Sequence, residues 1–314
     1  MLAIIVRLNE IERNLALIEF MDKSKLETPT WCLIMVQYAL WGLLFYSLNS
    51  IPVWVVCIWG AFMVAWYGNL QHEIIHGHPT GSRLFNSLFA WAPFTLWMPY
   101  HVYARGHLAH HLTPTLADPA QDPESYYFLE ADWQSMNPVY RFIMVANNTI
   151  AGRMVLGPAI VIVRFFITEI AIMVKGDFSN LTGWIFHIAL SAGFLYGVDY
   201  YLGFSAWLYV AGIAYPGLSI SLIRSFYEHR PSRIDTERTA IVEAGPFWSL
   251  IFLNNNLHVV HHDNPGTSWY LLPAIYKANR EDILEKNGGF FFNGYGEVFK
   301  RFFLKSKDTP LYPL

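Results

Sequence analysis

Residues 52–76 read PVWVVCIWGAFMVAWYGNLQHEIIH, an apolar run that ends in two histidines. Positions 52–67 contain no charged residue. A bilayer core of about 30 Å requires roughly 20 apolar residues in a helix, so this stretch predicts a slightly short membrane span. His72 and His76 follow at positions i and i+4, which lie on one face of a helix. The stretch therefore joins a predicted membrane helix to two histidines on one helix face, which are candidate metal ligands.

Three further stretches, 31–48, 183–202 and 204–223, are long and apolar enough to span a bilayer. Very short connections separate the spans within each pair, so we expect four membrane helices in two hairpins. Two more apolar stretches, 84–100 and 155–174, are poorer candidates for membrane spans, because the first contains two prolines and the second contains Arg164 and Glu169. Charges are costly at the bilayer centre, so we expect both stretches to lie at the membrane interface.

The composition agrees with a membrane protein. Hydrophobic residues make up 54% of the 314 residues and charged residues 14%, against about 25% charged residues in soluble domains. The formal net charge of −3 excludes a strongly basic, nucleic-acid-binding chain. Two cysteines do not form a disulfide framework.

We interpret the whole chain, 1–314, as one all-α domain. Residues 1–28 have helical apolar spacing and predict an amphipathic helix, either on the membrane surface or packed on the protein's own core. Residues 29–275 form the core, and 276–314 a C-terminal tail. Basic residues flank the polar ends of the spans, whereas the hairpin turns lack them. Positive charge marks the cytoplasmic side, so both termini and all polar connections are expected there.

Nine of the twelve histidines fall into four short groups. Three groups are the segments 72–76, 107–111 and 258–262, and the fourth is a single histidine after the last span. The nine histidines are His72, His76, His107, His110, His111, His229, His258, His261 and His262. In each H-x-x-H-H group, helical spacing places three imidazoles on one face. By the predicted topology, all four groups leave the membrane on the same side and converge.

Neutral imidazole is the commonest metal ligand in proteins and suits zinc, copper, iron and nickel. Nine nitrogen ligands are too many for one ion, because zinc, for example, is usually four-coordinate. They fit two metals with five or six coordination sites each, which leaves room for a small exogenous ligand. An open, all-nitrogen, two-metal site suits oxygen activation by iron, but the spacing alone also allows zinc or manganese.

The three histidine-rich segments 72–76, 107–111 and 258–262 are called histidine boxes below. With three such boxes in this order, the chain resembles the membrane fatty acid desaturase superfamily, whose members are integral-membrane histidine-box di-iron enzymes. The resemblance covers about residues 30–275. The run Asn254-Asn255-Asn256-Leu257-His258 and the segment 269–273, Trp-Tyr-Leu-Leu-Pro, are most similar to bacterial-type desaturases and hydroxylases.

The resemblance implies four membrane helices beneath a cytosolic cap that binds two iron ions, with O2 as co-substrate. It implies that the nine histidines are the metal ligands. It also implies attack on a C–H bond of a lipid or fatty acyl chain. Because the sequence shows neither a fused cytochrome b5 domain nor a C-x-x-C rubredoxin pair, we expect a separate electron donor of ferredoxin, rubredoxin or cytochrome b5 type, with its reductase. We expect a bacterial inner membrane, with the active site on the cytoplasmic side.

Carboxylates near the boxes are expected to orient the imidazole rings. The candidates are Glu73, Asp118, Asp122, Glu228 and Asp263. Related enzymes often have an asparagine four residues before the histidine equivalent to His229, where this chain has Ser225. A tenth ligand from Ser225 or from an asparagine of 254–256 stays open.

The leading hypothesis is a desaturase that introduces a double bond into a fatty acyl chain. The alternative is a hydroxylase or monooxygenase, or an oxidative decarboxylase that forms terminal alkenes, at the same di-iron site. A non-enzymatic metal transporter would need polar groups through the bilayer, and the spans contain little beyond His187 and Asp199.

Overall fold

The computed structural model describes residues 26–313 of the 314-residue chain. The amphipathic helix predicted for 1–28 therefore lies almost entirely outside the described residues. The longer helices are α2 (Thr28–Ser47), α3 (Val53–Ile75), α5 (Tyr100–Leu112), α7 (Pro138–Asn147), α8 (Ile150–Val174), α9 (Leu181–Tyr196), α11 (Tyr215–Ser225), α14 (Leu272–Lys286) and α15 (Tyr295–Phe302). The shorter elements are α4 (Arg83–Ser87), η1 (Leu88–Ala90), α6 (Glu130–Ser135), η2 (Gly197–Tyr201), α10 (Ala206–Leu208), η3 (Tyr209–Ala214), η4 (Asp235–Arg238), β1 (Ile241–Val242), α12 (Pro246–Ile251), α13 (His258–Asp263) and β2 (Phe291–Phe292).

Five helical segments in the described part of the chain are long and apolar enough to cross a membrane. Four of them match the predicted spans: α2, α3, α9 continued by the π-helical η2, and α10 to α11 through the π-helical η3. α3 runs to Ile75, well past the predicted end of its span, so His72 lies on its last turn. The continuous helix thus rigidly connects the apolar core with the first histidine box.

The fifth segment is α8, where we expected an interfacial stretch at 155–174. By length and apolarity it qualifies as a candidate span, so the described part of the chain has five candidate spans where we expected four. One charge in α8 is satisfied within the protein. The Glu169 side chain is buried, and its Oε2 accepts hydrogen bonds from Asn180 Nδ2 at 2.7 Å and Trp184 Nε1 at 2.9 Å. A buried, hydrogen-bonded carboxylate disfavours a helix in lipid less than a bare charge does.

Glycines allow α3 and α11 to approach closely. A Cβ on Gly217 of α11 would lie 2.5 Å from Val64 Cβ and 2.9 Å from the Ala61 carbonyl oxygen of α3. A Cβ on Gly60 of α3 would likewise lie 2.8 Å from Ile213. Small residues at such contacts are typical of helix packing in membranes.

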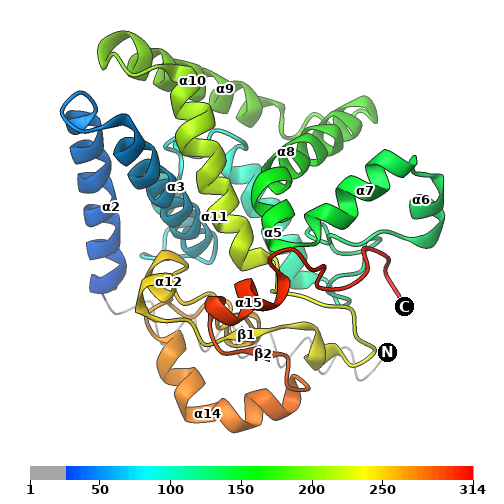
Figure 1. The fold of residues 1–314 in the computed structure, drawn as a ribbon. Helices are drawn as coiled ribbons and strands as arrows, with labels where there is room; N and C mark the ends of the chain where they lie inside the picture. Colours follow the sequence, from blue (N-terminus) through cyan, green and yellow to red (C-terminus); the bar gives the residue numbers. More distant parts are fainter. Residues whose placement is uncertain (1–25, 314) are drawn as a thin grey trace.

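A cap covers the end of the α3–α11 bundle that lies opposite the α9–α10 turn (Figure 1). α12, α14 and α15 lie there together with β1 and β2, a two-stranded parallel sheet with Ile241 opposite Phe291. The expected all-α class is therefore corrected to a mostly helical fold with one very small sheet. The cap covers the side of the bundle where α3 and α11 end.

The α3–α11 contact predicts the effect of one added methyl group. Gly217→Ala should lower the free energy of unfolding by about 1–3 kcal/mol, because the new Cβ overlaps Val64 and the α3 backbone. Thermal unfolding in detergent, followed by fluorescence-detected size exclusion, measures the change. Gly193→Ala is the matched control, because no atom lies within 4 Å of a Cβ built there. Equal midpoints for the two variants would contradict the close approach.

Candidate metal centre

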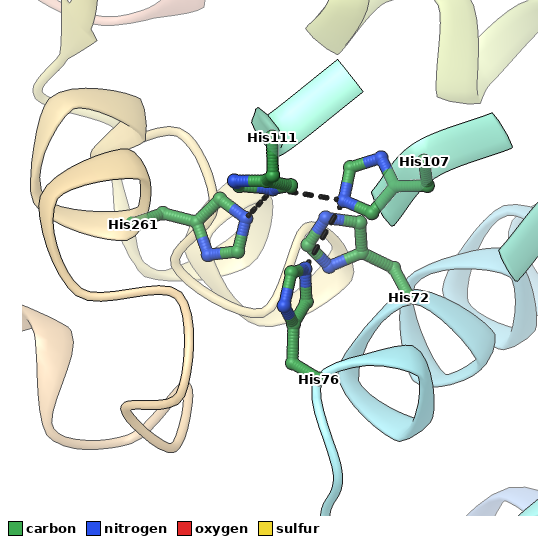
Figure 2. A group of neighbouring side chains, drawn as sticks. All are labelled: His72, His76, His107, His111 and His261. Atoms are coloured by element: carbon green, nitrogen blue, oxygen red, sulfur yellow. Dashed lines mark hydrogen bonds between the residues drawn. The ribbon is translucent and has the colours of Figure 1, made fainter. Parts of the chain in front are cut away.

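The nine histidines converge in two groups, and within each group the potential ligand atoms lie within 4.8 Å of one another. The first group contains His72, His76, His107, His111 and His261. The second group contains His110, His229, His258 and His262. Figure 2 shows the five rings of the first group pointing toward one another from α3, α5 and α13.

Helix geometry explains how each H-x-x-H-H box divides between the groups. Residues four apart on a helix differ by about 40° around its axis, whereas adjacent residues differ by about 100°. On α5, His107 and His111 therefore face the first group and His110 faces the second. On α13 the division is reversed, because His258 and His262 face the second group and His261 the first. Each of these two helices thus contributes to both groups and joins them.

The spacing between ring nitrogens matches a coordination shell. In the first group, His107 Nε2 lies 3.1 Å from both His76 Nε2 and His111 Nε2, and His261 Nε2 lies 3.0 Å from His111 Nε2. In the second group, His229 Nε2 lies 3.1 Å from the Nε2 atoms of both His110 and His258. Metal–nitrogen distances of about 2.0–2.1 Å place neighbouring ligand nitrogens roughly 3 Å apart.

Carboxylates next to two of the rings determine which ring nitrogen faces the centre of its histidine group. His110 Nδ1–H donates to Asp122 Oδ1 at 2.7 Å, and His107 Nδ1–H donates to Glu124 Oε1 at 2.9 Å. A proton on Nδ1 leaves the Nε2 lone pair free to bind a metal. Several such lone pairs within about 3 Å repel one another unless a cation lies between them, so the donor set fits two metal ions.

Asn255 connects the two groups. Its Oδ1 accepts from His258 Nδ1 at 3.0 Å, and its Nδ2 lies 3.2 Å from His72 Nε2. Asn255 follows two residues in the left-handed region, Leu253 with φ 48° and Asn254 with φ 57°. Leucine rarely adopts this conformation, so the turn is maintained by its surroundings. Of the positions left open for a tenth ligand, Asn255 contacts both groups, whereas Ser225 Oγ lies 3.4 Å from Tyr126 OH.

Burial keeps most of these rings neutral. Desolvation, reinforced by neighbouring rings, holds the pKa values of His229, His258, His261 and His262 well below the ordinary value. His110 is the exception. Burial alone would lower its pKa, but Glu124 and Asp122 outweigh burial and raise it to about 9. Neutral imidazole is the metal-binding form, and the carboxylates beside His110 favour a positive charge there.

The five carboxylates predicted to orient the rings lie in different settings. Asp122 contacts His110 directly, as described above. Glu228 Oε1 lies 3.4 Å from His258 Nδ1 and 2.7 Å from Arg224 Nη1. Asp118 caps a turn by accepting from Ala120 N at 2.9 Å. Asp263 is exposed at the end of α13.

Glu73 lies in a third buried group, with Glu27 and His78. His78 Nδ1 lies 2.6 Å from Glu27 Oε1, and His78 Nε2 lies 3.8 Å from Glu73 Oε1. Glu73 Oε1 also accepts from Trp269 N at 2.8 Å. These contacts connect the start of α2, the first box and the loop after the third box.

Sequence reasoning missed Glu124 as the partner of His107, although it is only two residues from a predicted carboxylate. The signal that could have found it is the spacing: Asp122 and Glu124 lie twelve and seventeen residues after their histidines, on the loop that follows α5. Asn255 was considered only as a metal ligand, not as a residue that contacts both groups.

A sequence model of the fatty acid desaturase family matches residues 48–294 of the chain. The matched region contains all nine histidines of the two groups. A search of curated proteins finds no match to this chain.

The contact between Asp122 and His110 predicts a site-specific loss of metal. Asp122→Asn removes the charged acceptor of the His110 ring proton and should weaken iron binding at the four-histidine group about 10–100-fold. Iron titration of the purified protein, followed by elemental analysis, measures this affinity. Asp118→Asn is the matched control, because its carboxylate caps a turn on the same loop. The assignment would be wrong if both variants bound iron equally.

Proposed function

Because this chain belongs to the fatty acid desaturase family, we propose that it introduces a double bond into the acyl chain of a lipid or fatty acid in an oxygen-dependent reaction. The family implies a di-iron oxidoreductase with a fatty-acyl substrate. The observation that most supports the reaction is the division of nine histidines into groups of five and four. Two metal-binding groups at the end of an apolar helix bundle suit a reaction between oxygen and an apolar chain.

In this proposal the nine histidines are the ligands of two iron ions. When bound, the ions supply the oxygen-activating chemistry that breaks unactivated C–H bonds. Removal of two hydrogens from adjacent methylenes, with one O2, two electrons and two protons, gives the alkene and two waters. The electrons come from a separate donor of ferredoxin, rubredoxin or cytochrome b5 type with its reductase.

The protein side chains position the ligands. Asp122 and Glu124 orient the rings of His110 and His107, and Glu228 approaches His258 while it pairs with Arg224. Asn255 fixes the distance between the groups through its contacts with His72 and His258. Fixed outer contacts of this kind set ring orientation and ligand basicity. His258 and His261 are buried, which limits the access of water to the site.

The reaction is tested by profiling total lipids and hydrocarbons by mass spectrometry after expression in a bacterial host. We expect a product two hydrogens lighter than its precursor, absent from a His261→Ala variant because one ligand of the five-histidine group is lost. His101→Ala is the control on the same helix, since His101 lies outside both groups.

Two other products would contradict desaturation while keeping the oxidative site. A product one oxygen heavier would indicate a hydroxylase, and a terminal alkene one carbon shorter would indicate an oxidative decarboxylase. Loss of activity in His101→Ala to the same degree as in His261→Ala would contradict the assignment of the groups.

We further propose that α8 lies along the membrane interface and that four helices cross the bilayer. Both ends of α8 contact segments outside the other candidate spans. Ala151 N donates to Phe303 O at 3.0 Å near the start, and Glu169 lies 3.7 Å from Arg105 of α5 near the end. In this proposal the site lies on the cytoplasmic side of a bacterial inner membrane.

Single cysteines test the placement of α8. With the native cysteines replaced, cysteines at Lys175 and at Thr149, which flank α8, should react with a membrane-impermeant reagent from the same, cytoplasmic side. Asn49, in the α2–α3 turn, is the control position and should react from the opposite side. Opposite reactivity of the two α8 positions would show that α8 crosses the membrane.

A further inference from the structure

A small cavity at the start of α8 is lined in part by cationic side chains. It measures about 10 Å³ and lies between the start of α8, the segment 126–128 and the C-terminal segment near Lys307. Three positively charged side chains, Arg153, Arg164 and Lys307, line it. A cavity of this size has space for roughly one atom as large as a water oxygen.

Arg153 is buried with unmet hydrogen-bond donors. Its side chain is 1% exposed, and within the described residues its Nε and Nη1 have no hydrogen-bond partner. The guanidinium carbon lies 3.9 Å from the ring centroid of Tyr126, which provides a cation–π contact. An aromatic face does not accept in-plane N–H groups, so the donors at the guanidinium edge still lack an acceptor. A buried charge with unmet donors is costly unless something pairs with it.

The charged groups around Arg153 do not neutralise its positive charge. Lys307 Nζ donates to the Phe226 carbonyl at 2.8 Å, and burial lowers the pKa of Lys307 to about 8, so at neutral pH it is mostly protonated. The nearby acid is Asp308, which accepts from Tyr127 OH and, at 2.8 Å, from Asn148 Nδ2.

Asp308 offsets at most one of the three positive charges. Among the described residues, no ion pair within 4 Å includes Arg153, Arg164 or Lys307. The cavity wall therefore has an excess of positive charge, and the two unmet donors of Arg153 face one unmet acceptor of the lining residues, Asn147 Oδ1.

We propose that Arg153, Arg164 and Lys307 form a binding site for one monovalent anion of the size of chloride. The charge excess requires an anion, and the free guanidinium edge supplies charge-assisted hydrogen bonds. The small cavity volume, about 10 Å³, favours a small anion over a tetrahedral oxyanion such as sulfate. Gly157 leaves room for the Arg153 side chain, because a Cβ there would lie 3.0 Å from Arg153 Cδ.

An anion bound at this site would connect three segments of the chain. The segment 126–128 follows Asp122 and Glu124, which orient His110 and His107. Phe128 N donates to the Pro310 carbonyl, and Lys307 N donates to the Asn148 carbonyl, so three segments meet at the cavity. An anion between them cross-links the loop after the second box, the start of α8 and the C-terminal segment. This inference does not depend on the reaction proposed above.

The test compares thermal unfolding of the purified full chain in increasing chloride, with gluconate keeping the ionic strength constant. We expect the unfolding midpoint of the wild type to rise with chloride, because a ligand that binds only the folded state stabilises it. Arg153→Met, which keeps an unbranched apolar stem but removes the guanidinium group, should weaken the apparent chloride affinity at least roughly tenfold. Arg141→Met is the matched control outside the cavity and should keep the wild-type response.

A second measurement uses the wild type alone, so that it does not depend on the folding of the variants. Crystals containing bromide in place of chloride should show an anomalous peak within hydrogen-bonding distance of the Arg153 guanidinium. A wild-type midpoint that is independent of chloride, or a cavity without a bromide peak, would overturn the proposal. An unchanged chloride response in Arg153→Met would also overturn it.

Discussion

The site depends on the repulsion between imidazole lone pairs that face one another. Hydrogen-bond acceptors such as Asp122 and Glu124 hold protons on the outer nitrogens, so the inner nitrogens meet as bare acceptors about 3 Å apart. Without cations, such an arrangement is unfavourable in a buried site. Two cations turn the same contacts into coordination bonds. The loops and helices around the site are therefore arranged for a metal-bound state.

The fold keeps this arrangement rigid by attaching the histidines to long or well-anchored helices. α3 extends from the apolar bundle into the first box without interruption, and glycine contacts bring α11 close to it. α5 and α13 each contribute to both groups, so the two metal positions cannot move independently. The first box, the loop after the third box and the start of α2 are further connected through Glu73, His78 and Glu27.

The sequence predicted the parts of this arrangement that follow from local periodicity. Spans and boxes depend on spacing within one helix, and the convergence of the boxes followed from the predicted topology. The division of each H-x-x-H-H box could not be predicted, because it depends on how α5 and α13 face each other. Glu124 was missed for a similar reason, since its contact depends on a loop conformation with no periodic pattern. That α8 qualifies as a candidate span was not expected, because Glu169 was treated as a charge exposed to lipid, whereas Asn180 and Trp184 donate hydrogen bonds to it.

Locating the metals tests the central claim, that nine histidines bind two ions in separate groups, most directly. Anomalous diffraction at the iron edge, from crystals of protein produced in iron-replete cells, reveals each position. We expect two peaks, one among His72, His76, His107, His111 and His261, and the other among His110, His229, His258 and His262. A single peak shared by both groups, or iron confined to the group of Glu27, Glu73 and His78, would contradict the account.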